Sequence, residues 1–171
     1  MRRNKFVVVA GLYAALVTGC ATTPKPDPAV AAKALFDQTV KQYHLPSAEI
    51  QGPEHAALLE KAAAGYQRLL DTYPHQTNYC AQALRSLANV RAEQGRLNDA
   101  VRLYARVGER YPQMEWEVLQ AWKSAADLLW DAGRQSEARV FYTKIGDRFN
   151  QPDAPAIVKT IVHAAAGRCG K

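Results

Sequence analysis

Cysteine, histidine and methionine are scarce in this chain, which has 3 cysteines, 4 histidines and 2 methionines among 171 residues. The histidines are scattered, whereas a metal site needs ligands at close and regular spacing. The sequence also has no glycine-rich phosphate loop, no GxSxG elbow and no HExxH motif. These absences argue against a metal site, a cofactor and a catalytic set, so we predict that the protein is not an enzyme.

Long apolar runs are missing as well. The longest one, Phe6–Val17, follows the basic residues Arg2, Arg3 and Lys5. It has about a dozen residues, whereas a membrane-spanning helix needs about 20. A short apolar core behind a basic start is typical of a secretory signal peptide. We therefore expect residues 1–19 to be a targeting segment that is not part of the fold.

The residues Val17-Thr18-Gly19-Cys20 close this segment and resemble the lipobox of bacterial lipoproteins. In that family the chain is cut before the cysteine, which then carries a diacylglycerol and usually a fatty acid on its new amino group. Two or more acyl chains anchor a protein stably. Because Ala21 rather than aspartate follows Cys20, the resemblance implies an outer-membrane protein that faces the periplasm. The alternative is an ordinary secretory signal with a chance cysteine.

The excess of positive charge is small once the targeting segment is set aside. The chain has 22 lysines and arginines against 16 aspartates and glutamates, for a net charge of +6. Residues 1–19 carry three basic side chains and no acidic one, which leaves +3 for the remainder. A charge of this size does not indicate nucleic-acid binding. It is compatible with a weak attraction to anionic peptidoglycan or lipid head groups.

What the sequence does contain is an internal repeat with an offset of 38 residues. An offset of this length is typical of helical repeat arrays, whose units stack because none of them can bury its apolar face alone. A partial third copy ends at Tyr73-Pro74, as the next copy ends at Tyr111-Pro112. The matching pairs are Gly95 and Gly133, Ala100 and Ala138, Tyr104 and Tyr142, Val107 and Ile145, Gly108 and Gly146, Arg110 and Arg148, and Tyr111 and Phe149.

Apolar residues at helical spacing predict an all-α fold, because no segment alternates with a period of two. Residues 45–53 are expected to form a loop, since Pro46, Gly52 and Pro53 interrupt any helix there. The predicted helices are 29–44, 53–72, 78–94, 97–110, 115–132, 135–148 and 154–166.

The same pattern divides the chain into four parts. They are a signal peptide (1–19), a lipidated cysteine with a proline-rich tether (20–28), a helical domain (29–167) and a tail (168–171). Cys80 and Cys169 could form a disulfide in an oxidising compartment. Their positions about two repeats apart argue against the short Cα separation that a disulfide needs. The alternative is a free Cys80 that packs as a small apolar residue.

Small and aromatic residues recur within the repeat at a spacing similar to that of the tetratricopeptide repeat (TPR). The resemblance implies a right-handed superhelix of antiparallel helix pairs, with about three repeats and a C-terminal capping helix. With the lipobox it resembles the TPR lipoproteins of envelope assembly and Tol–Pal systems. The period of 38 differs from the 34 residues of the family. The residues that carry the resemblance are Ala83, Leu84, Leu87, Ala88, Gly95, Ala100, Tyr104 and Pro112, then Ala121, Trp122, Ala125, Ala126, Gly133, Ala138 and Tyr142.

In TPR proteins the first helix of each pair lines a groove that holds the partner. Carried over by position, the groove residues here are Gln82, Arg85, Asn89, Glu93, Gln120, Lys123, Asp127 and Trp130. Arg85 and Asn89 resemble the basic-plus-amide pair that holds a peptide carboxylate in some TPR domains, but an ordinary polar helix face is the favoured interpretation. Trp130 is either an exposed anchor or buried under a neighbouring helix. Trp122 is expected in the core, and Trp116 fits either setting.

A repeat scaffold with a lipid anchor and no catalytic set predicts a non-catalytic adaptor. Its expected partners are other envelope proteins, and its only membrane contact is the acylated cysteine. The alternative is a structural lipoprotein that binds peptidoglycan or a saccharide directly.

Overall fold

The computed structural model describes residues 26–170. The predicted signal peptide, the lipidation site Cys20, the first part of the predicted tether and Lys171 lie outside the described residues. None of the helices in the described part is both long enough and apolar enough to cross a membrane.

The described residues form helices and no strand, which confirms the predicted all-α fold. Five of the helices form the regular part of the array: α3 (Pro53–Thr72), α4 (Thr77–Glu93), α5 (Leu97–Arg110), α6 (Glu115–Asp131) and α7 (Gln135–Phe149). Before them come α1 (Pro28–Thr39), the π-helical stretch η1 (Val40–His44) and α2 (Leu45–Ser47). The chain closes with α8 (Ala156–Cys169).

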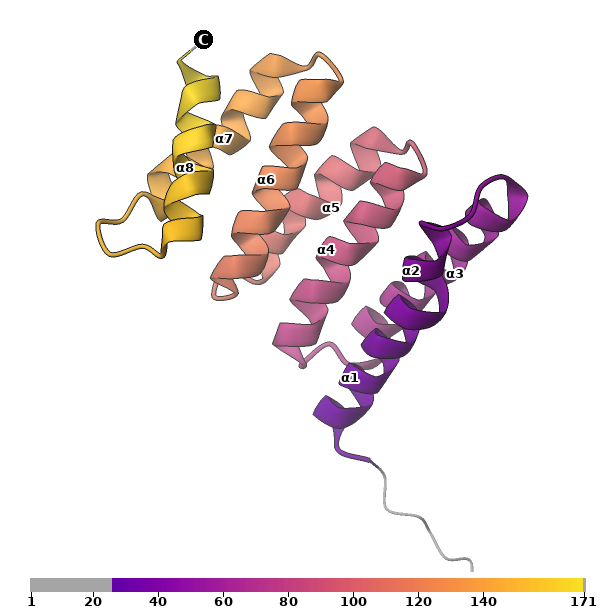
Figure 1. Ribbon diagram of the computed structural model, residues 1–171. Helices are drawn as coiled ribbons and strands as arrows, with labels where there is room; N and C mark the ends of the chain where they lie inside the picture. The colour runs from indigo at the N-terminus through magenta and orange to yellow at the C-terminus, as the bar shows by residue number, and fades with distance from the viewer. Residues whose placement is uncertain (1–25, 171) are drawn as a thin grey trace, which may run out of the picture.

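The helices form two layers, and the chain alternates between them (Figure 1). The segment α1–η1–α2 and the helices α4, α6 and α8 form the front layer, and α3, α5 and α7 lie behind. Each helix from α3 onward packs against the next one in sequence, and α4 also contacts α6 within the front layer. Sequential packing of this kind is the architecture of stacked helical repeats.

The repeated residues explain where the helices end. Gly95 and Gly133 adopt φ values of 72° and 76°, a left-handed conformation that glycine reaches without the steric penalty of a side chain. Helices α3 and α5 end before Tyr73-Pro74 and Tyr111-Pro112. The residue before a proline is pushed out of helical geometry, so these two stops have the same physical cause.

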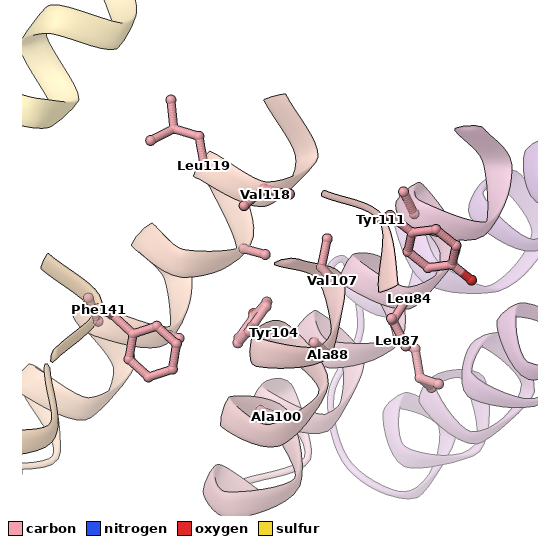
Figure 2. Close-up of a cluster of buried hydrophobic side chains, with 14 of the residues drawn as sticks. Leu84, Leu87, Ala88, Ala100, Tyr104, Val107, Tyr111, Val118, Leu119 and Phe141 are labelled. Carbon is pink, nitrogen blue, oxygen red and sulfur yellow. The ribbon is translucent and has the colours of Figure 1, made fainter. Parts of the chain in front are cut away.

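The core is built from the same repeat positions in both copies. Ala100 and Ala138 are fully buried, as are Val107 and Ile145, and Tyr104 and Tyr142 are only 3% and 4% exposed. Figure 2 draws part of this core, with Ala100, Tyr104 and Val107 following one another along α5. Alanines let paired helices approach closely, and each tyrosine fills the space that the small residues leave.

The predicted loop at residues 45–53 was wrong in its first part. The helix continues through η1 into α2, which ends at Ser47. Pro46 lies at the start of α2, directly after the π-helical stretch, and His44 and Leu45 before it keep right-handed helical backbone angles. The proline at position 46 therefore placed the predicted break too early.

The helical domain also exceeds its predicted limits of 29–167. It begins at Pro28, where the Asp27 side chain accepts a hydrogen bond from the Ala29 N–H at 2.7 Å and so caps α1. It ends at Cys169, so Arg168 and Cys169 belong to α8 rather than to a tail.

The two cysteines of the helical domain are both free. Cys80 is buried in α4, where its thiol donates a hydrogen bond to the Tyr73 carbonyl at 3.2 Å. Cys169 is exposed at the end of α8. The alternative of a free and buried Cys80 is therefore the correct one. Burial raises the pKa of its thiol, which favours the protonated and unreactive form.

Candidate functional site

The eight residues predicted to line a groove lie on the two neighbouring front-layer helices α4 and α6. Glu93 is exposed and the other seven are half-buried. Each helix contributes one stripe of side chains at spacings of three and four residues, and α4 contacts α6 directly. We call this surface, formed by Gln82, Arg85, Asn89 and Glu93 with Gln120, Lys123, Asp127 and Trp130, the front face.

Arg85 is not a free cation on this face. Its Nε lies 2.5 Å from Oε2 of Glu117, and the two side chains are 25% and 11% exposed. Glu117 comes from α6, so the ion pair joins α4 to α6 across the front layer. A charge-assisted hydrogen bond with so little access to water is mainly structural. The predicted role of Arg85 as one half of a carboxylate clamp therefore competes with a contact inside the protein.

Asn89 and Asp127 are also engaged, and in the same way in the two repeats. The hydroxyl of Tyr104 on α5 donates to Oδ1 of Asn89 at 2.7 Å. The hydroxyl of Tyr142 on α7 donates to Oδ1 of Asp127 at 2.6 Å. Asp127 also accepts from Lys123 at 2.6 Å. Within the described residues no hydrogen bond uses the N–H donors of the Asn89 amide, whereas Lys123 already has a counter-charge.

A third tyrosine completes this series in the first helix pair. Tyr66 on α3 shares a hydrogen bond of 2.8 Å with Nδ1 of His44, whose Nε2 lies 3.2 Å from Oε1 of Glu93. Burial raises the pKa of Tyr66 and that of Tyr104 to about 12. Burial, reinforced by the Asp127 carboxylate, raises the pKa of Tyr142 as well. All three phenols therefore act as neutral hydrogen-bonding groups at physiological pH.

Trp130 is not the exposed anchor that one sequence interpretation offered. The Arg168 guanidinium of α8 lies 4.8 Å from the centre of its ring, and the Tyr142 ring packs edge-on at 6.1 Å. The indole is half-buried beneath the last helix. A cation over an indole face is a favourable contact, so Trp130 fastens α8 to the array.

Trp122 lies at the edge of the core rather than fully inside it. It is half-buried between α5 and α7, with the Phe149 ring at 6.1 Å. Its ring covers Gly108 so closely that a Cβ atom added there would lie 2.6 Å from its Nε1. The contact explains why glycine occupies that position in α5.

Trp116 is the tryptophan that faces solvent, with 49% of its surface exposed. It lies in the first turn of α6, four residues before Gln120, and so extends the front-face stripe of that helix. It borders a cleft of about 430 Å³, which we call the Trp116 cleft. The other walls include Leu119 of α6, Phe149 of α7 and Val158 of α8, with the segment 151–155 between them.

The helical spacing in the sequence already places Trp116 on the same face as the predicted groove residues of α6, although it was not among them. The stripe Gln120, Lys123, Asp127 extends backward by one turn to position 116. The corresponding position in α4, 38 residues earlier, is Asn78. The helical period therefore points to Trp116, but only the structure shows that its surroundings leave it open.

Residues 82–113 match the family model of the tetratricopeptide repeat. This segment of the chain is thus similar to a tetratricopeptide repeat. The matched TPR segment runs from α4 through α5 to the turn before α6, and the 38-residue offset repeats this helix pair as α6 and α7. TPR segments serve protein–protein interaction and are typically non-catalytic. A comparison with curated proteins found no match.

Proposed function

We propose that this protein is a non-catalytic adaptor, which binds a segment of another protein along its front face. The observation that carries the proposal is the Trp116 cleft, where a half-exposed indole borders about 430 Å³ of open volume at one end of the α6 stripe. Cavities of this size hold small ligands or several side chains. Aromatic residues in pockets supply much of the binding energy in protein interfaces.

The rest of the proposal concerns where the adaptor works. The lipobox-like Val17-Thr18-Gly19-Cys20 supports a lipoprotein with a diacylglycerol and a fatty acid on Cys20. Ala21 supports retention in the outer membrane, with the helical domain in the periplasm. The partner is then another envelope protein, of the kind found in envelope assembly, secretion or pilus machinery.

The anchor is tested by metabolic labelling with a palmitate analogue. We expect label in the wild-type protein and in the outer-membrane fraction, and none in a Cys20→Ser variant. Label that persists in the variant, or an unlabelled wild type, would contradict the lipoprotein proposal.

The adaptor role is tested by crosslinking in cells followed by affinity purification in detergent. We expect a defined envelope protein to be captured by the wild type and to be lost with Trp116→Ala. Val140→Ala is the matched control, because Val140 is 53% exposed on the back-layer helix α7. Capture that is equal for both variants, or no captured protein at all, would overturn the proposal.

Sedimentation with purified peptidoglycan addresses the alternative function. A protein that sediments with peptidoglycan through Trp116, and captures no protein partner, would be a saccharide-binding lipoprotein instead.

A further inference from the structure

The Trp116 cleft has an acidic rim. Glu115, at the start of α6, and Asp153, in the segment before α8, both line it and are both exposed. Neither carboxylate forms an ion pair with another residue of the described chain 26–170. The cleft therefore presents two carboxylates whose charge is not balanced by a direct partner.

The cation in the cleft lining is committed elsewhere. The Arg148 guanidinium donates a hydrogen bond to the Pro112 carbonyl in the α5–α6 turn. It also lies 5.3 Å from the centre of the Phe149 ring and 5.7 Å from that of Trp122. These contacts hold the guanidinium against the turn and the two rings without cancelling its charge. With two carboxylates and one guanidinium in its lining, the cleft keeps a net negative charge.

The acidic character is local and contrasts with the remainder of the molecule. The chain without residues 1–19 carries a formal charge of +3. On the front face, Arg85 is paired with Glu117 and Lys123 with Asp127. The rim of the cleft is thus a place where negative charge stands unpaired beside an exposed aromatic ring.

We propose that the Trp116 cleft selects a basic side chain, arginine in preference to lysine, on the segment of the partner protein. The inference rests on the proposed adaptor function and names the chemistry of its ligand. A guanidinium can stack on the indole of Trp116 and donate hydrogen bonds to carboxylates at its edge. The methylene stem of arginine would lie along the apolar side chains of Leu119, Phe149 and Val158. An uncharged apolar side chain could pack on Trp116, but it would form no favourable electrostatic interaction with either carboxylate.

The test uses N-acetyl-arginine-methylamide as the probe and the tryptophan indole N–H signals of the purified protein in NMR spectra. Trp116→Phe assigns the signal of Trp116. We expect arginine to shift this signal with millimolar affinity, while the signals of Trp122 and Trp130 stay in place. The citrulline analogue has nearly the same shape without the charge, so it should not shift the signal.

Glu115→Gln/Asp153→Asn is the variant that removes the rim charge and keeps the shape. We expect it to weaken arginine binding several-fold, since each exposed ion pair contributes up to about 1 kcal/mol. Glu109→Gln is the matched control, because Glu109 is an exposed acid on α5 outside the cleft. Equal shifts with arginine and citrulline, or a shift with N-acetylglucosamine instead, would overturn the inference.

The outcomes also separate this inference from the adaptor function. Suppose that a partner is captured through Trp116 and its capture is unaffected by Glu115→Gln/Asp153→Asn. The adaptor function then stands, and the preference for a basic side chain is wrong. Arginine binding at the cleft without any captured protein would instead support the cation site and contradict the adaptor function.

Discussion

The hydroxyl of Tyr142 donates to the carboxylate of Asp127 across the last helix pair, at 2.6 Å. Tyr104 makes the same contact with Asn89 in the preceding pair, also over a separation of 15 residues. In both cases a buried phenol from the back layer reaches a half-buried polar group on the front face. The repeat therefore specifies a polar link within each pair as well as an apolar core, and a link of this kind fixes how the two helices align.

The two links should differ in strength because their acceptors differ in charge. We expect Tyr142→Phe to lower the free energy of unfolding by about 1–2 kcal/mol, and Tyr104→Phe by about 1 kcal/mol or less, since hydrogen bonds to ionised groups are the stronger ones. Urea denaturation followed by circular dichroism measures both. In an Asp127→Asn background the cost of Tyr142→Phe should fall to that of Tyr104→Phe. A cost that does not change would show that charge is not the cause.

Gly108 and Gly146 occupy the same repeat position and predict opposite effects of one substitution. A Cβ at Gly108 would lie 2.6 Å from Nε1 of Trp122, whereas nothing lies within 4 Å of a Cβ at Gly146. We expect Gly108→Ala to destabilise the protein by about 1–3 kcal/mol through overpacking. Gly146→Ala should stabilise it by about 0.5–1 kcal/mol, since alanine favours the helix. Thermal unfolding of both variants decides this, and losses of equal size would contradict the role of Trp122.

The buried tyrosines predict a loss of stability at alkaline pH. In the unfolded chain Tyr66 and Tyr104 ionise near their ordinary pKa of about 10, whereas burial raises each pKa to about 12 in the folded protein. Above pH 10 the unfolded state therefore releases protons that the folded state retains. The free energy of unfolding should be unaffected by these groups below pH 10 and fall between about pH 10 and 12.

Urea denaturation at a series of alkaline pH values measures this effect. The control is the Tyr66→Phe/Tyr104→Phe variant, whose stability should decline less steeply over the same interval. Parallel declines in both proteins would assign the loss to other groups.

The Arg85–Glu117 ion pair predicts asymmetric effects of single and double substitutions. Arg85→Met leaves Glu117, which is 8% exposed, without its counter-charge, and we expect a loss of about 2–4 kcal/mol. Arg85→Met/Glu117→Gln should recover a substantial part of it, because no unpaired charge remains buried. Chemical denaturation tests both variants. If the double variant is less stable than the single one, the cost does not come from the orphaned carboxylate.

Much of the fold could be predicted from the glycines and prolines that separate the helices in the sequence. Helix α5 has the predicted limits Leu97–Arg110, since Gly95 precedes it and Tyr111-Pro112 follows it. Glycine and proline change the backbone conformation at their own position or that of the preceding residue. Helix ends that they determine can therefore be predicted from the sequence alone. The continuation of the helix into α2 was missed because Pro46 does not end it: Leu45, directly before the proline, keeps right-handed helical backbone angles.

The site was less predictable because its properties depend on partners far away in sequence. Arg85 and Glu117 are 32 residues apart, and nothing in the helical period of α4 indicates that they meet. Trp130 and Trp116 share one face of α6, yet Arg168 covers the former and leaves the latter open. The period identifies which residues share a face, but the next helix decides which of them remain accessible.

Among residues 26–170, helix α8 is packed from one side only, against α7 and Trp130 of α6, whereas α4, α5 and α6 are each held from two sides. In an array stabilised by nearest neighbours, the terminal element opens more readily than the middle. Since Val158 of α8 forms a wall of the Trp116 cleft, detachment of this helix would dismantle the cleft before the rest of the array unfolds. Occupancy of the cleft and docking of α8 are therefore linked equilibria, and a ligand held there would slow amide hydrogen exchange throughout the last helix.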